Sequence, residues 1–366
     1  MSAPAPPTGP VRPTRVERAA RSRRTTRLVV AAVAVTLMAL AIAVFLENRE
    51  DGRGGQPGDD RGASTRPDEP SLIALQVEGG PAPLLAVIGV PPDGTPFVMP
   101  VSSELTVVVP GQGETSAAGV AALPPDSMRT ALSNMTGVWI PHHAVLSLRD
   151  LAATVDAAGG LAVNLPSAYP TTSGVLGPGE MTMTGGQARA FLAGSTDDAM
   201  VRWEILLTAL LTDPPELVAA GDAMGEDTRE ATSVISRAEG AEVLEMPTER
   251  VTATIVVPVY PALDELISGS LGTPMPVPAI VQNGSGQPGV GEAVAVRIIP
   301  EGFRVVLAQN AQTFDVVRTD VFANGPGHES EARSVKAALG VGRVSVAAVP
   351  SNVGDITIVV GKDFTA

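Results

Sequence analysis

One uncharged, mostly apolar run near the N-terminus constrains this chain more than any other feature of its sequence. The run, Leu28 to Leu46, reads LVVAAVAVTLMALAIAVFL. A helix of that length spans roughly 28 Å at about 1.5 Å per residue, which is close to the hydrocarbon thickness of a bilayer. Arginines precede the run and acidic residues follow it. The positive-inside rule therefore predicts a cytoplasmic N-terminus and an extracytoplasmic C-terminal bulk.

A cleaved signal peptide is the alternative explanation of the same run. Against it, the apolar stretch is longer than the core of a usual signal peptide. No small-x-small cleavage site follows before the sequence ENREDGRGG. We therefore predict a single-pass protein of the cell membrane, with a transmembrane helix over residues 28–46.

The charge is divided unequally along the chain. Residues 1–27 carry seven arginines and one glutamate, whereas residues 47–366 carry 18 basic and 38 acidic residues. A body this acidic does not suit a nucleic-acid binder, because such binding depends on cations that neutralise phosphates. The chain contains no cysteine, which excludes disulfides and thiolate metal sites.

Changes in composition divide the chain into five segments. Residues 1–27 form a Pro- and Arg-rich cytoplasmic tail before the membrane span, and residues 47–70 form a flexible linker with almost no apolar residue. Residues 71–277 mix short apolar runs with helical patterns, and a Pro-rich hinge, TPMPVP, closes this segment. Residues 278–366 alternate strand and helix patterns, with helices predicted over Gly289–Ile299 and Glu329–Leu339. The predicted fold class is α/β or α+β, with two domains outside the membrane.

Periodicity and turn residues predict several elements of the first domain. PPDG (91–94) marks a hairpin turn between two apolar strands. Helical spacing predicts a helix over Ala144–Ala158, which a Gly-Gly pair ends, and a second helix within Ala188–Leu211. VTATIVVPV (251–259) predicts a strand.

The C-terminal segment resembles the LytR C-terminal domain. VQNGSGQPGVGEAVAVRIIPEGFRVV (281–306) is similar to the opening of that domain: a strand, an Asn-Gly turn, a helix start and a Gly-Phe pair before the next strand. HESEARSVKAALG (328–340) and ITIVVGKDF (356–364) are similar to its later helix and closing strand.

The preceding segment resembles the catalytic domain of the LytR-CpsA-Psr family of cell-wall proteins. GVWIPHHAVLSLRDLAATVDAAGGLAVNLP (137–166) follows the helix, Gly-Gly and strand pattern of that domain, and LGPGEMTMTGGQARAFL (176–192) resembles its loop and helix before the active site. The resemblance implies a protein that moves a glycopolymer from a polyprenyl pyrophosphate lipid onto peptidoglycan. In that chemistry arginines hold the pyrophosphate and carboxylates hold magnesium.

Most of the residues that the resemblance requires are replaced here. Ser103, Ala193 and Ser195 stand where the family has arginines, and a family aspartate falls near Ala82. Two candidates remain. The resemblance makes Glu104 a residual magnesium ligand, and Arg202 a residual contact for the lipid pyrophosphate; one or both would be catalytic if catalysis persists. Losing several such charge contacts together predicts a degenerate domain, or pseudoenzyme, because each contact contributes orders of magnitude in rate.

Three other features have a functional and a structural interpretation. His142-His143 is compatible with a metal site, but also with packing at a turn. Asp197-Asp198 could bind a cation with Glu104 or form a solvated loop. NGSGQPG (283–289) lacks the Lys-Ser/Thr partner of a phosphate loop and predicts a tight turn.

These observations predict a non-catalytic accessory or scaffold protein in cell-wall glycopolymer assembly or envelope integrity, with no cofactor. Its expected partners are the membrane and a polyprenyl-linked wall precursor, peptidoglycan or an active protein of the same family, but no nucleic acid. The first alternative is an active transferase that requires magnesium. The second is an envelope-linked transcriptional regulator.

Overall fold

The computed structural model describes residues 70–195, 197–212, 237–349 and 351–366. Ser64–Ala366 belong to one compact unit. The predicted tail (1–27), the predicted span (28–46) and all but the last residue of the linker (47–70) lie outside the described residues. Within the described ranges, no helix is both long and apolar enough to cross a membrane.

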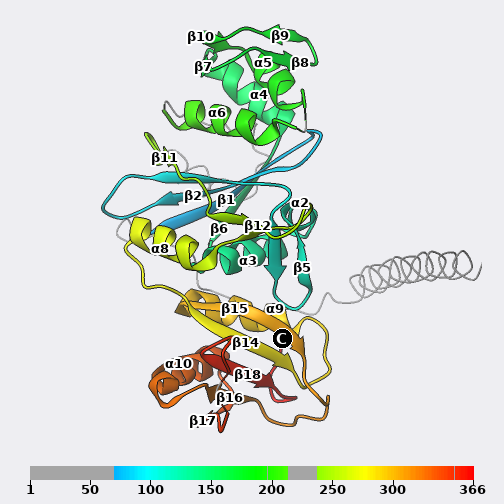
Figure 1. Ribbon diagram of the computed structural model, residues 1–366, viewed down its shortest axis with the longest axis vertical. Coiled ribbons are helices and arrows are strands. Elements are labelled where there is room, and N and C mark those ends of the chain that lie inside the picture. The colour runs from blue at the N-terminus through cyan, green and yellow to red at the C-terminus, as the bar shows by residue number, and fades with distance from the viewer. Residues whose placement is uncertain (1–69, 196, 213–236, 350) are drawn as a thin grey trace, which may run out of the picture. The chain divides into compact units, whose positions relative to one another are not determined.

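A five-stranded mixed sheet forms the centre of the first domain (Figure 1). Its strands stand in the order β11-β3-β2-β1-β6. Strands β1, β2 and β3 are antiparallel neighbours, β6 runs parallel to β1, and β11 runs parallel to β3. The hairpin predicted at PPDG is confirmed as the β2–β3 connection. The bounds are β1 Ser71–Glu78, β2 Leu84–Val90, β3 Phe97–Val101, β6 His142–Ser147 and β11 Glu242–Val243.

Both faces of this sheet are buried, which explains the continuous apolar runs in its strands. Side chains of β1 alternate between two cores: Ile73 and Leu75 belong to one cluster, and Leu72 and Ala74 to the other. Helices α4, α5 and α6 cover the first face, and α2, α3 and α8 cover the second. Their bounds are α2 Ala117–Ala121, α3 Pro125–Thr136, α4 Leu148–Ala157, α5 Gly185–Leu192, α6 Ala199–Thr212 and α8 Tyr260–Leu271.

Four two-stranded pairs complete the first domain. Each is antiparallel and joins segments near one another in the sequence. The pairs are β4 Thr106–Val109 with β5 Gly113–Ser116, β7 Leu161–Leu165 with β10 Gly179–Met183, β8 Tyr169–Thr171 with β9 Gly174–Leu176, and β12 Thr248–Arg250 with β13 Val256–Pro258.

The second domain has its own five-stranded sheet, in the order β15-β14-β18-β16-β17. All neighbouring strands are parallel except β16 and β18. Helices α9 and α10 contribute Val294 and Val335 to the core beneath this sheet. The elements are β14 Val277–Asn283, α9 Val290–Ile298, the 3-10 turn η2 Ile299–Glu301, β15 Phe303–Asn310, β16 Asp320–Ala323, the 3-10 turn η3 Pro326–His328, α10 Glu329–Leu339, β17 Arg343–Val346 and β18 Ile356–Val360.

The prediction of a mixed α/β fold is confirmed, but two predicted elements have the wrong extent. The helix predicted over Ala144–Ala158 begins only at Leu148, because the residues before it pair with β1 as strand β6. Ser147 caps this helix, and its side chain accepts a hydrogen bond from the backbone N–H of Asp150 at 3.1 Å. The strand predicted over 251–259 is shortened to Val256–Pro258, because residues before it turn back toward β12.

Candidate functional site

A depression of about 720 Å³ lies where β1 and β6 end at one edge of the first sheet. Glu78 and Ser147 enter it from the two strand ends, Arg149 from the first turn of α4, and Arg189 and Ala193 from α5 and its end. Thr172 and Ser173 close it from the β8–β9 hairpin. The depression therefore combines cationic and hydroxyl side chains.

A close approach of α4 and α5 brings the two arginines to the same depression. The backbone N–H of Gly185, at the start of α5, donates to the Asp156 carboxylate at 2.7 Å. A Cβ at Gly185 would lie 1.9 Å from the carbonyl oxygen of Ala152, so the helices can approach this closely only with glycine there. The sequence GGQARAFL therefore both starts α5 and fixes where Arg189 stands.

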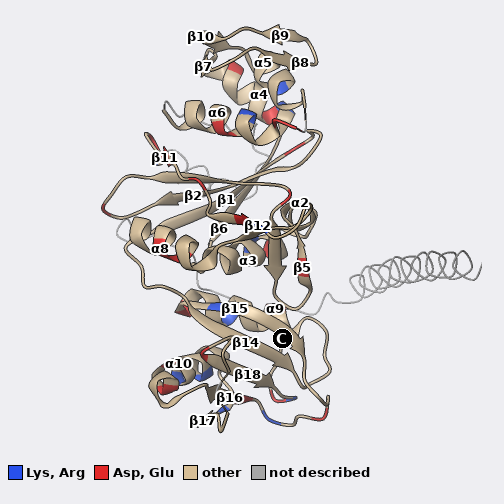
Figure 2. Cartoon of the chain, in the orientation of Figure 1, with Lys and Arg blue, Asp and Glu red and all other residues tan. Residues whose placement is uncertain are grey.

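The charge of the depression is dominated by arginine. Arg149 and Arg189 are exposed, and neither forms an ion pair with another residue in the described part of the chain. The Glu78 carboxylate accepts a hydrogen bond from Gln76 at 2.6 Å. Figure 2 shows both basic and acidic segments among α4, α5 and α6, so the balance is set by the residues that line the depression itself. An anion is the ligand class that this arrangement fits.

Arg202 lies elsewhere, inside the fold rather than in the lining of the depression. Its side chain is 1% exposed. The guanidinium donates to the Asp198 carboxylate at 2.7 Å and to the Phe191 carbonyl at 2.7 Å, and it stacks over the Tyr169 ring. The hydrogen bond from Arg202 lowers the pKa of Asp198 below its usual value. Arg202 thus joins α5 to α6, and its role in pyrophosphate binding stays a prediction.

Glu104 is also absent from the lining of the depression. Its carboxylate is exposed and lies 3.7 Å from the guanidinium of Arg250. Neighbouring Ser103 offers its backbone carbonyl to the N–H of Ala118 at 3.1 Å, at the start of α2. Glu104 as a magnesium ligand likewise stays a prediction.

The remaining candidates do not gather into a metal centre. Among the residues that the structure describes, no group of three or more His, Asp or Glu side chains could hold a metal ion. His142 is buried in β6, and His143 follows it in the same strand. Asn283 begins the turn predicted at 283–289, where its side chain accepts from the backbone N–H of Ser285 and of Gly286.

The sequence reasoning missed Arg149 and Arg189. A helix assigned from Ala144 placed Arg149 in a helix interior rather than at a helix start beside the sheet edge. The Ser147-x-x-Asp150 spacing is a capping signal and could have located the correct start. The Gly-Gly pair before Gln187 could likewise have indicated close packing at the start of α5.

A second depression, of about 480 Å³, lies between α6 and β7 and contains Glu204. Burial raises the pKa of Glu204 above its usual value, and the charge of Glu245 adds to the effect. A carboxyl group whose pKa is raised in the folded state destabilises that state once it ionises. The loss of folding free energy is therefore absent below the ordinary pKa of 4.5 and present at neutral pH.

Glu204→Gln is therefore expected to raise the melting temperature at pH 7 by about 1–3 °C and to change it little near pH 4. Thermal denaturation at the two pH values measures the difference. Glu249→Gln, at an exposed position in β12, is the matched control and should leave both temperatures unchanged. An equal effect of Glu204→Gln at both pH values would contradict the burial argument.

The fold and the depression define a two-domain α/β protein with an anion-compatible site at a sheet edge. Residues 277–364 match the family described as "LytR cell envelope-related transcriptional attenuator". This match confirms the resemblance of the C-terminal domain to the LytR C-terminal domain. No curated protein is similar enough in sequence to count as a match.

The chain is also similar to several solved structures, at low sequence identity. TagT of Bacillus subtilis is 15% identical with a TM-score of 0.47, over 57% of this chain and 93% of TagT. A LytR-Csp2A-Psr enzyme from Actinomyces oris is 19% identical with a TM-score of 0.43, over 56% of this chain and 89% of the enzyme. A transcriptional regulator from Enterococcus faecalis is 14% identical with a TM-score of 0.47, over 57% of this chain and 91% of the regulator.

Proposed function

We propose that this chain is a membrane-anchored, extracytoplasmic accessory protein of the cell envelope, which binds an anionic lipid-linked wall precursor without transferring it. The observation that carries the non-catalytic half of the proposal is the burial of Arg202 and its hydrogen bonding within the fold. This last arginine of the expected clamp is 1% exposed and donates to its own fold. Burial, and the use of Nε and one Nη nitrogen within the fold, argue against a role for this arginine in holding a pyrophosphate.

The binding half of the proposal rests on the depression beside α4 and α5. Two exposed arginines there can each donate two parallel hydrogen bonds to a phosphate, and the surrounding hydroxyls suit a sugar. The ligand class, a polyprenyl pyrophosphate carrying a glycopolymer, comes from the resemblance of residues 71–277. One solved structure of TagT contains bound octaprenyl pyrophosphate lipid.

The direct experiment gives the full-length chain a polyprenyl pyrophosphate lipid with and without magnesium, and measures both binding and transfer to peptidoglycan. An accessory protein binds the lipid and forms no product. Replacing both Arg149 and Arg189 with alanine should weaken binding at least tenfold, since hydrogen bonds to charged groups contribute about 1.5–3 kcal/mol each. Arg333→Ala, on the exposed face of α10, is the control and should bind normally.

The transferase alternative makes the opposite prediction in the same assay. It expects magnesium-dependent transfer that disappears in Glu104→Ala. Transfer by the unaltered chain would overturn the accessory role, and binding that is unaffected by the double alanine variant would overturn the depression as the site.

The transcriptional alternative is tested separately. It expects a phenotype when residues 1–27, the strongly basic segment, are removed while residues 28–46 are kept. The acidic balance of residues 47–366 argues against direct contact of that part with DNA.

A further inference from the structure

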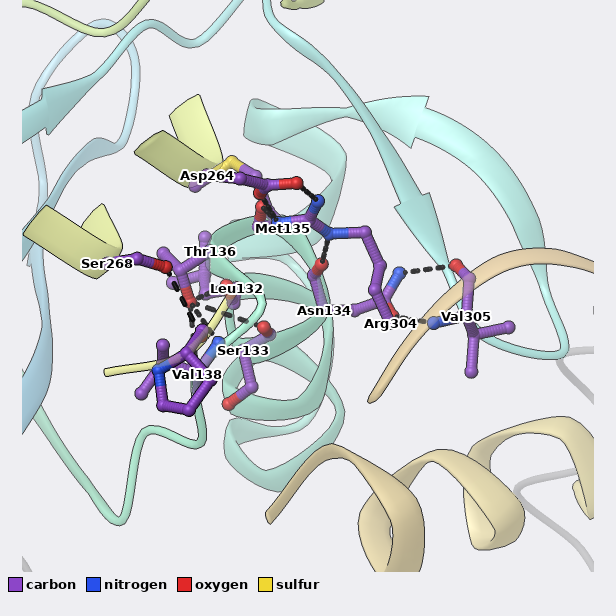
Figure 3. Close-up of polar contacts among 11 residues, drawn as sticks. Leu132, Ser133, Asn134, Met135, Thr136, Val138, Asp264, Ser268, Arg304 and Val305 are labelled. Atoms are coloured by element: carbon purple, nitrogen blue, oxygen red, sulfur yellow. Dashed lines mark hydrogen bonds and ion pairs between the residues drawn. The ribbon is translucent and has the colours of Figure 1, made fainter. Parts of the chain in front are cut away.

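Strand β15 lies at the edge of the C-terminal sheet, where a row of backbone groups has no neighbouring strand. At one position of β15, a side chain of the preceding domain forms hydrogen bonds with these backbone groups (Figure 3). Asn134 of α3, 1% exposed, donates from its amide nitrogen to the Val305 carbonyl at 2.9 Å. Its amide oxygen accepts from the Val305 N–H at 2.7 Å. Asn134 therefore satisfies both backbone groups of one residue, as a paired strand would.

Arg304 makes the complementary contact from the C-terminal domain. Phe303 and Val305 point into their own core, so the alternation of β15 turns Arg304 toward the preceding domain. Its guanidinium donates to the carbonyls of Asn134 at 2.9 Å and Met135 at 3.0 Å, in the last turn of α3 (Figure 3). The last carbonyls of a helix have no partner within the helix, and a cation is favourable there.

Helix α8 closes the same contact. Asp264 accepts from Arg304 at 2.6 Å, and the guanidinium lies 4.6 Å from the centre of the Tyr260 ring. Arg304 is 3% exposed. Two helices of the first domain thus surround a single side chain of the second.

The two domains also approach each other closely at two glycines, where a side chain would not fit. A Cβ at Gly291, in α9, would lie 2.5 Å from the Cα of Gly111, in the β4–β5 turn. A Cβ at Gly137, which ends α3 with φ near +73°, would lie 2.5 Å from Pro276 and 2.7 Å from Arg304. Trp139 packs against the apolar core of the C-terminal domain. The two surfaces are therefore matched in shape as well as in hydrogen bonding.

We propose that the C-terminal domain is permanently docked on the preceding domain through this α3–β15 contact, and that the described residues unfold as one cooperative unit. The connection between α8 and β14 is only residues 272–276, two of which are proline. A short tether keeps the effective concentration of one domain near the other in the millimolar range or above, so even modest contacts hold them together.

One consequence concerns how the C-terminal domain should be studied. Its removal would take Val305 away from Asn134, Arg304 away from Asp264, and the apolar core of the C-terminal domain away from Trp139. A phenotype from deleting residues 278–366 would then report damage to the first domain as well as any lost ligand. This proposal does not depend on the ligand of the depression.

The test is to insert a protease recognition sequence at Met275, which is 57% exposed, in the full-length chain. After cleavage, size-exclusion chromatography in detergent should show the two fragments eluting together. Asn134→Ala should raise the dissociation constant of the cleaved fragments about 10- to 100-fold, because two hydrogen bonds are lost and two backbone groups stay unpaired. Asn310→Ala, at the exposed end of the same strand, is the matched control.

Amide hydrogen exchange supplies a readout that does not depend on fragment recovery. The Val305 N–H should be protected in the intact chain and exchange faster in Asn134→Ala, while Val281, in the middle of β14, stays protected if the domain is still folded. Separation of the unaltered fragments after cleavage, or two separate unfolding transitions in the uncut chain, would overturn the proposal.

Discussion

Replacing Arg304 with methionine is expected to lower the free energy of unfolding by about 3–5 kcal/mol, the usual cost of breaking a buried ion pair from one side. The Arg304 and Asp264 side chains are 4% and 12% exposed, so the Asp264 carboxyl group would lose its cationic partner with little water to replace it. The carbonyls of Asn134 and Met135 would lose their donors as well. Methionine occupies a similar volume, which limits any cavity.

The double variant Arg304→Met with Asp264→Leu should recover a large part of that loss. Both charges are then gone, and apolar groups of similar size often replace a buried pair at little cost. Guanidinium denaturation of the two single variants and the double variant gives the coupling free energy directly. Arg333→Met is the control, because its pair with Glu329 is exposed on α10 and such pairs contribute at most about 1 kcal/mol. If Arg304→Met and Arg333→Met lowered the free energy of unfolding equally, the argument that the Arg304–Asp264 pair is buried and stabilising would be contradicted.

The C-terminal domain could be predicted element by element because its signals are local. The helix predicted over 329–339 is α10 with the same bounds, and the helix predicted over 289–299 is α9 within one residue at each end. Each has an apolar face of regular spacing and ends near a glycine or a turn. Strand and helix lengths in this domain are thus set by residues close together in the sequence.

Contacts between distant residues could not be predicted in this way. Arg304 and Asn134 are separated by 170 positions, and nothing in the local pattern of either indicates the other. The sequence also did not predict where the candidate site lies, for a related reason. The apolar residues around Ala144 fit a helix as well as a strand, and only pairing with β1 decides between them. Because those residues belong to strand β6, helix α4 begins only at Leu148, and Arg149 lies in its first turn beside the end of the sheet.

Replacing Arg202 with methionine is expected to lower the free energy of unfolding by about 2–4 kcal/mol at pH 7. The Phe191 carbonyl would be buried without its donor, and Asp198 would lose the partner that keeps its carboxylate ionised. The lowered pKa of Asp198 means that the pair stabilises the fold above the ordinary value of 3.8 and loses that contribution as the pH falls through the folded-state pKa. The difference in the free energy of unfolding between the unaltered chain and Arg202→Met should therefore become smaller at acidic pH.

Urea denaturation at pH 7 and near pH 3 measures both effects, and it also separates two explanations of any loss of lipid binding. If Arg202 held the pyrophosphate, Arg202→Met would weaken binding at a temperature where the variant is fully folded, with little change in stability. The buried contacts predict the reverse: a less stable protein that binds normally while folded. Arg189→Met is the matched comparison, because Arg189 is exposed in the depression and should affect lipid binding without affecting stability.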